Sequence, residues 1–287
     1  MRRTMIATVL LVAAGVLLLS GNALGHPHIL AADNKREVTG EELLADLSQA
    51  QVVLIGELHN HVGHHQAQLA ILDALRKRGK PMALGVEMFR QDSQKFLDRW
   101  TAGMLSADDF RTVFEDNWSM WREYLPVFDY VRDHSVKTVG LNIPRELTSK
   151  VARQGFAALE DEQRQALGNV VCVVDHAYSN YIRRAMGGHG REGRQYLLFC
   201  EAPLLWDTMM ARNIIRFLAE YPEFSMVVIA GSAHAWKFGI PRQMLDQADI
   251  SYRVVLPEIE GRIDRTNLSP ELTDYLWLDY GDAGWHF

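Results

Sequence analysis

The sequence predicts an α/β fold, with a mostly parallel β-sheet flanked by helices and a smaller inserted helical subdomain. Apolar runs of strand length recur along the chain. They are apolar at consecutive rather than alternate positions, which is typical of strands covered on both faces. Helical patterns separate the early runs, which indicates βαβ units with right-handed crossovers. In the middle of the chain helical periodicity dominates instead, which predicts the subdomain.

The first residues have the pattern of a secretory signal. Arg2 and Arg3 precede an uncharged apolar run over residues 5–20, and the small residues Ala23 and Gly25 stand before a cleavage site at His26. We therefore expect a signal peptide over residues 1–25 and an exported, periplasmic protein. An uncleaved anchor helix is the alternative. Asn22 stands where a bacterial lipoprotein would carry its acceptor cysteine, so no lipid anchor is expected.

The mature chain, residues 26–287, is expected to form a single domain. It opens with a loop and a short helix around residues 41–47. A helix is then predicted from about His61 to the stop at Gly79, a second over 90–100, and the helical subdomain over roughly 106–221. The predicted strands cover residues 51–56, 81–86, 137–142, 224–231 and 251–257.

Composition excludes some classes of function. The formal net charge of −6 and the pI near 6.0 argue against nucleic acid as a partner. The chain has no P-loop motif, which disfavours a nucleotide cofactor, and no GxSxG elbow, which disfavours Ser232 as a nucleophile. Cys172 and Cys200 lie in apolar segments, so two buried unpaired thiols are expected, and a disulfide is the alternative.

Polar side chains stand at the carboxyl ends of four predicted strands. They are Glu57, Glu87, Asn142 and His234. In an open α/β sheet, ligands bind outside this edge. The sequence therefore predicts that these groups meet at one ligand site.

One interpretation of this edge is a metal site. Glu57, His59, Glu87 and His234 are carboxylates and imidazoles suited to a divalent ion such as zinc, manganese or iron. The spacing matches no sharp motif such as HExxH, and the same groups could instead hold loops in place by hydrogen bonds.

The histidine cluster after the first strand divides by helical position. His64 shares a stripe with Gln68, Ile71 and Leu75, so it should face inward beside Glu57. His61, near the helix start, and His65, at the margin of that face, are expected to be bystanders.

Two predicted helical segments are rich in aromatic residues. Trp118, Trp121 and Tyr124 are spaced at helical intervals, and Tyr178 and Tyr181 follow His176. Such stripes are usually core, although a flat apolar ligand would require a similar wall.

The chain resembles the ChaN-like haem-binding family, in segments that occur in the family's order and span most of residues 50–245. The resemblance implies a homodimer that encloses haem, with each iron held by a tyrosine, and a role in haem or iron acquisition beside other envelope uptake components. The matching segments are VVLIGELHNHVGHHQAQLAIL, ALGVEMFRQDSQKFLDRW, WREYLPVFDYVRDHSVKTVGLNIPREL, EAPLLWDTMMARNI and VVIAGSAHAWKFGIPRQM.

Within that resemblance, Tyr178 and Tyr181 are the first candidates for the ligand of the haem iron, because phenolate suits ferric haem. His176, Tyr124 and His64 are further candidates for haem contacts. The chain departs from the family at Pro203, where the motif usually has glutamine, and in lacking the lipoprotein cysteine of many relatives.

A more distant resemblance extends to erythromycin esterases and Tiki-type metalloproteases. It implies the alternative function, a metal-dependent hydrolase. Glu57 and Glu87 would then act as bases or metal ligands, and His59 and His234 as metal ligands or proton shuttles. The haem-binding interpretation assigns no catalytic residue.

Overall fold

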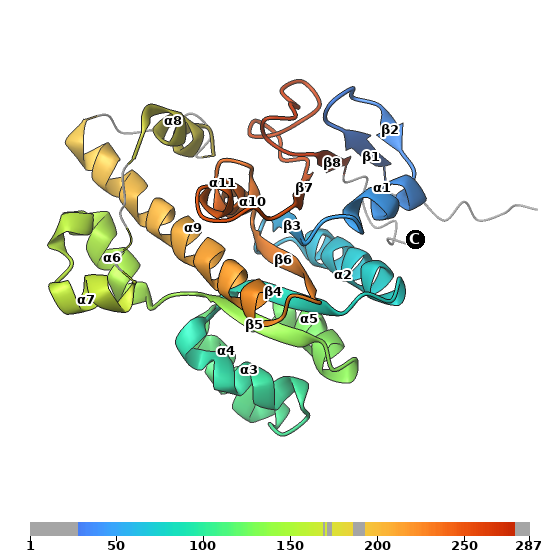
Figure 1. Ribbon diagram of the computed structural model, residues 1–287, viewed down its shortest axis with the longest axis horizontal. Coiled ribbons are helices and arrows are strands. Elements are labelled where there is room, and N and C mark those ends of the chain that lie inside the picture. Colours follow the sequence, from blue (N-terminus) through green and yellow to red (C-terminus); the bar gives the residue numbers. More distant parts are fainter. Residues whose placement is uncertain (1–27, 169, 171–173, 186–192, 279–287) are drawn as a thin grey trace, which may run out of the picture.

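A single twisted sheet of eight strands forms the centre of the protein, and helices cover both of its faces (Figure 1). The computed structural model describes residues 28–168, 170, 174–185 and 193–278. The predicted signal peptide and Cys172 lie outside these residues. Among the helices of the described part, none is both long and apolar enough to cross a membrane.

Six neighbouring strands of the sheet run parallel, and two short strands are added antiparallel at one edge. The predicted mostly parallel α/β fold is therefore confirmed, as are its five predicted strands. The order across the sheet is β2 (Glu37–Val38), β1 (His28–Ala31), β8 (Tyr275–Leu278), β7 (Tyr252–Pro257), β3 (Val52–Glu57), β6 (Ser225–Gly231), β4 (Met82–Arg90) and β5 (Lys137–Asn142).

The sequence pattern missed β1 and β8. Residues 28–31 were expected in a loop, but they pair with β8, from Ala31 opposite Tyr275 to His28 opposite Leu278. Both strands are four residues long. A run this short carries too little periodicity to be recognised without its partner.

One face of the sheet is covered by the helices of the first half of the chain. Their apolar sides form one core with Val53, Ile55, Leu84 and Val227 of the sheet. This layer contains α1 (Gly40–Leu47), α2 (Val62–Lys77), the 3₁₀ turn η1 (Gln91–Ser93), α3 (Gln94–Thr101), α4 (Ala107–Asn117) and α5 (Trp121–Asp133).

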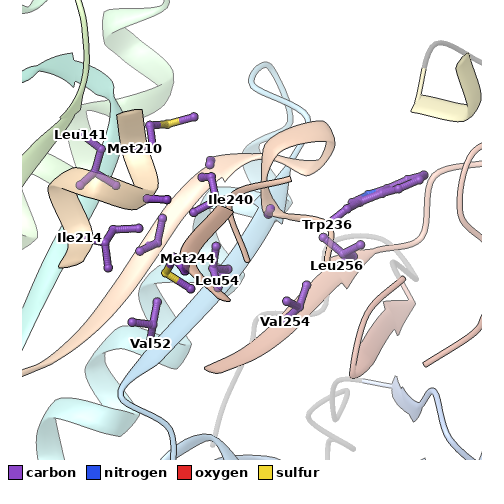
Figure 2. Close-up of a cluster of buried hydrophobic side chains, with 14 of the residues drawn as sticks. Val52, Leu54, Leu141, Met210, Ile214, Trp236, Ile240, Met244, Val254 and Leu256 are labelled. Carbon is purple, nitrogen blue, oxygen red and sulfur yellow. The ribbon is translucent and has the colours of Figure 1, made fainter. Parts of the chain in front are cut away.

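The opposite face is covered mainly by the long helix α9 (Arg194–Glu220) with α10 (Ser232–Ala235) and α11 (Ile240–Leu245). Figure 2 shows this core, which includes Met210, Trp236 and Met244 from the helical side and Val52, Leu54 and Leu256 from the strands. Burial on both faces explains why the strands are apolar at consecutive positions.

The helices of residues 106–221 divide between two places. Helices α4 and α5 belong to the first layer. Beyond the edge strand β5, α6 (Arg145–Gln154) and η2 (Phe156–Ala158) pack on α9 around a small core of their own, and α7 (Asp161–Ala166) follows them in the chain. Helix α8 (His176–Ala185) packs against α9 and contributes Tyr178 to the larger core. Cys200 of α9 is buried, as expected.

Candidate functional site

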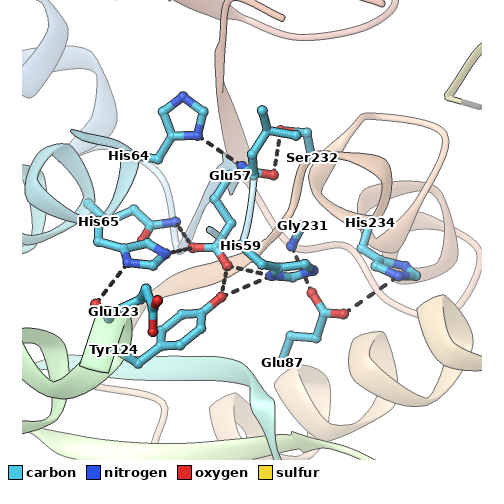
Figure 3. A network of polar contacts seen from close by, with 12 residues as sticks. Glu57, His59, His64, His65, Glu87, Glu123, Tyr124, Gly231, Ser232 and His234 are labelled. Atoms are coloured by element: carbon cyan, nitrogen blue, oxygen red, sulfur yellow. Dashed lines mark hydrogen bonds and ion pairs between the residues drawn. The ribbon is translucent and has the colours of Figure 1, made fainter. Parts of the chain in front are cut away.

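Polar side chains from separate strands meet at the carboxyl edge of the parallel sheet, as the sequence predicts (Figure 3). Glu57 at the end of β3 is in register with Gly231 at the end of β6. Glu87 lies in β4 and accepts the Gly231 amide proton at 2.7 Å. The side chain of Asn142, at the end of β5, donates to the backbone carbonyl of Glu87 at 2.9 Å. These two hydrogen bonds therefore link the ends of β6, β4 and β5.

Glu57 is the centre of the first hydrogen-bond network. Its Oε1 accepts from His59 Nδ1 at 2.7 Å and from the Tyr124 hydroxyl, and its Oε2 accepts from Gln68 Nε2 at 2.8 Å. Burial alone would raise the pKa of Glu57, but the hydrogen bonds from His59 and His65 more than offset burial and hold that pKa well below its usual range. Glu57 is therefore a buried carboxylate anion.

His65 belongs to this network, and its expected role as a bystander is wrong. Its side chain is buried, with Nδ1 donating to the Glu123 carbonyl at 2.9 Å and Nε2 lying 3.3 Å from Oε2 of Glu57. Because α2 begins at Val62, His65 lies in its first turn, on the side that faces the end of β3 and α5.

His64 faces inward, as predicted, but it serves the backbone. Its Nδ1 accepts the Leu58 amide proton at 2.9 Å, and its ring stacks on His61 with centroids 3.9 Å apart. Burial, together with His61, lowers the pKa of His64 to about 3, so the ring is neutral. His61 is the N-cap of α2.

A second network surrounds His234. Its Nδ1 donates to Asp207 Oδ1 at 2.6 Å, and its Nε2 lies 3.6 Å from Glu87 Oε1. Burial alone would lower the pKa of His234, but the Glu87 and Asp207 carboxylates raise it to about 9. His234 is therefore an imidazolium between two carboxylates at neutral pH.

Asp207 was missed by the sequence reasoning. It is fully buried in α9 and also accepts the Tyr178 hydroxyl proton, with Oδ2 at 2.6 Å. The signal was present in the sequence, because Asp207 is a single carboxylate in the otherwise apolar stretch PLLWDTMMA. A buried carboxylate in such a stretch requires a partner.

Glu87, from the second network, lines a cavity of about 740 Å³. Trp118 and Trp206 line it, and each packs edge-on against a histidine: Trp118 against His59 at 5.1 Å and Trp206 against His234 at 5.5 Å between centroids. Burial alone would lower the pKa of His59, but its hydrogen bond to Glu57 and the Glu87 charge raise it. The cavity thus combines aromatic walls with a charged, hydrogen-bonded base.

The predicted haem-contact residues lie in different environments. Tyr124 is fully buried in the Glu57 network, whereas Tyr178 is buried against Asp207. His176, the first residue of α8, is exposed. Tyr181 also lies in α8, but its side chain is outside the described residues. Iron binding at Tyr124 or Tyr178 would have to displace a hydrogen bond to a buried carboxylate.

The four predicted metal ligands divide between the two networks. Glu57 and His59 belong to one, and Glu87 and His234 to the other. Within the described ranges, no group of three His, Cys, Asp or Glu side chains is arranged to hold a metal ion. The Ser232 hydroxyl donates to the Glu57 backbone carbonyl at 3.1 Å, which is a structural contact. Pro203 lies inside α9.

Comparison with solved structures relates this fold to others. A solved structure of cofacial heme binding to ChaN of Campylobacter jejuni is 21% identical, covers 88% of this chain and 96% of its own, and superposes with a TM-score of 0.68. An erythromycin esterase mutant in its open conformation is 14% identical, with coverages of 80% and 76% and a TM-score of 0.48. The likeness to the first supports the same fold.

A curated relative and a family model also match. Protein RETICULATA-RELATED 5, chloroplastic, of Arabidopsis thaliana is 22% identical over 280 residues, which cover 89% of this chain but only 37% of that protein. The model described as haem-binding uptake, Tiki superfamily, ChaN matches residues 43–244. The chain therefore belongs to the ChaN haem-binding family of the Tiki superfamily.

Proposed function

We propose that this protein binds haem as a cargo in the cavity at the carboxyl edge of the sheet. The observation that carries the proposal is this cavity of about 740 Å³, lined by Trp118, Trp121 and Trp206, in a member of a haem-binding family. A flat apolar ring requires aromatic walls, and ligand cavities of this size are typical of drug-sized and cofactor ligands.

The described residues also fit the polar parts of such a ligand. The Nε1 groups of Trp118 and Trp206 are buried and lack a hydrogen-bond partner among the described residues. A buried donor without a partner costs about 1–3 kcal/mol, so a ligand or water that supplies an acceptor would relieve that cost. When bound, ferric haem would offer an iron that a tyrosine phenolate can ligate, and we propose Tyr181 of α8 for this role, because Tyr178 is hydrogen-bonded to Asp207 and does not line the cavity.

Hemin titration of the purified protein tests the proposal. We expect a Soret band that shifts and saturates at a fixed stoichiometry, together with quenching of tryptophan fluorescence. Trp118→Leu and Trp206→Leu should weaken binding, whereas Trp277→Phe, at a buried site that does not line the cavity, is the matched control. A titration without saturation in the wild-type protein would contradict the proposal.

We also propose export and a homodimer. Export is supported by the basic, apolar and small-residue pattern of residues 1–25, and N-terminal sequencing of protein from the periplasm should begin at His26. The dimer is supported by family membership alone. Light scattering with and without hemin tests it, and a mass of one chain under both conditions would exclude it.

A hydrolase that uses Glu57, His59, Glu87 and His234 is the second candidate. The specific observation in its favour is that the pKa values of Glu57, His59 and His234 are all shifted at the carboxyl edge of the sheet, as is common at acid–base sites. Ester and peptide turnover, measured with metal analysis, tests it. Glu57→Gln should abolish any turnover, and turnover that survives this change would exclude the assignment.

A further inference from the structure

We infer that Arg145 binds a carboxylate of the ligand at the mouth of the 740 Å³ cavity and so selects an anionic ring over a neutral one. The inference rests on the proposed function, because the carboxylate in question is a propionate of haem. Arg145 is the first residue of α6, three residues after the end of β5, and its exposed side chain lines the cavity.

The other arginine of the cavity lining is already engaged. Arg90 donates through Nη2 to Asp116 Oδ2 at 2.7 Å, through Nη1 to the Asp116 carbonyl at 2.9 Å, and through Nε to Asp92 at 3.2 Å. Its guanidinium group is therefore neutralised and held in place. For Arg145, by contrast, no ion pair or hydrogen bond of the guanidinium group is found among the described residues. Its guanidinium group is therefore available for a bidentate hydrogen-bonded pair with a carboxylate of a ligand.

Most acidic side chains of the lining have other partners and do not neutralise Arg145. Asp116 is paired with Arg90, and Glu115 is paired with Arg111 at 2.8 Å. Glu87 is buried at the base of the cavity, where it accepts the Gly231 amide proton and faces His234. Glu146 is the exception, because it lines the cavity beside Arg145 without a cationic partner among the described residues.

The chemistry of the ligand explains why a cation is required at this position. Haem has an apolar ring and two carboxylates on one edge, so the carboxylates should lie at the open end of an aromatic-walled cavity. A bidentate arginine–carboxylate pair is among the stronger hydrogen-bonded contacts. The start of α6 adds a favourable helix dipole for a negative group. Arg145 should therefore position the ring through its edge.

The test compares hemin with haem dimethyl ester, in which both propionates are methylated and uncharged. Binding of each to the full-length protein is measured by absorbance titration, for wild type, Arg145→Gln and Arg145→Lys. We expect Arg145→Gln to weaken hemin binding by about tenfold and to leave ester binding unchanged. Arg145→Lys keeps the charge but loses the fork, so its loss for hemin should be smaller.

Two further variants test whether an effect on hemin binding is specific to Arg145. Arg153→Gln removes an exposed arginine from the last turn of the same helix, away from the cavity lining, and should leave both affinities unchanged. Glu146→Gln removes the neighbouring repulsive carboxylate and should tighten hemin but not the ester. Equal losses for hemin and ester in Arg145→Gln, or no loss for either, would overturn the role of Arg145 while leaving haem binding intact. Absence of hemin binding in the wild type would remove the proposed function and this inference with it.

Discussion

Individual buried residues at the sheet edge carry charge states that set how the protein responds to pH. His64 is buried and neutral, with a pKa of about 3 in the folded state against about 6.5 when unfolded. Between these values the unfolded chain binds the proton and the folded protein does not. Stability should therefore be fully present above pH 6.5 and fall as the pH drops toward 3, by about 2 kcal/mol from this residue at pH 5.

The variant His64→Asn isolates that contribution, because the amide oxygen can still accept the Leu58 amide proton but cannot titrate. Urea unfolding at pH 7 and pH 5 should show a smaller loss of stability on acidification than in the wild type. His134→Asn, at an exposed position, is the control and should keep the wild-type pH dependence. An unchanged pH dependence in His64→Asn would show that His64 is protonated in the folded protein.

Substitution of Tyr178 distinguishes between two roles for this residue, positioning Asp207 and ligating the haem iron. Tyr178→Phe removes one of two donors to the buried Asp207 carboxylate and should cost about 1–3 kcal/mol of unfolding free energy. If Tyr178 only positions Asp207, the absorbance spectrum of the hemin complex will stay as in the wild type, and Tyr181→Phe will change it. A changed spectrum in Tyr178→Phe with normal Tyr181→Phe would assign the ligand to Tyr178.

At the scale of elements, α5 begins in a strained conformation beside the cavity. Met120 precedes its first residue with φ of 66°, a left-handed value that is unfavourable for a side chain with a Cβ. Met120→Gly should therefore be more stable than Met120→Ala by about 1 kcal/mol, although glycine also loosens the unfolded chain. Thermal unfolding of the two variants measures the difference. Equal stability would mean that the backbone carries no strain there.

Elements were predictable from sequence where their pattern was long and self-contained. The parallel strands show unbroken apolar runs because helices cover both faces, and that pattern also fixes which residues reach the carboxyl edge. Glu57, Glu87, Asn142 and His234 were found in this way. The partners of these residues were not found from the sequence. Asp207, which pairs with His234, comes from the distant helix α9, and His65 faces inward because α2 begins at Val62. Short strands such as β1 exist only through their tertiary partner.

At the scale of the whole molecule, a ligand in the cavity would contact both helical layers at the sheet edge. The lining includes Trp118 from the first layer and Trp206 from α9 on the opposite face, with Glu87 of β4 between them. Binding there should therefore couple to global unfolding. At a free hemin concentration 100 times Kd, the unfolding free energy should rise by about 2.7 kcal/mol. Thermal melts of the wild type against hemin concentration measure this, and Arg145→Gln at the same hemin concentration should show a smaller increase. An increase in melting temperature of equal size in Arg145→Gln would show that Arg145 does not contribute to hemin affinity, and no increase in the wild type would show that hemin does not bind the folded protein in preference to the unfolded chain.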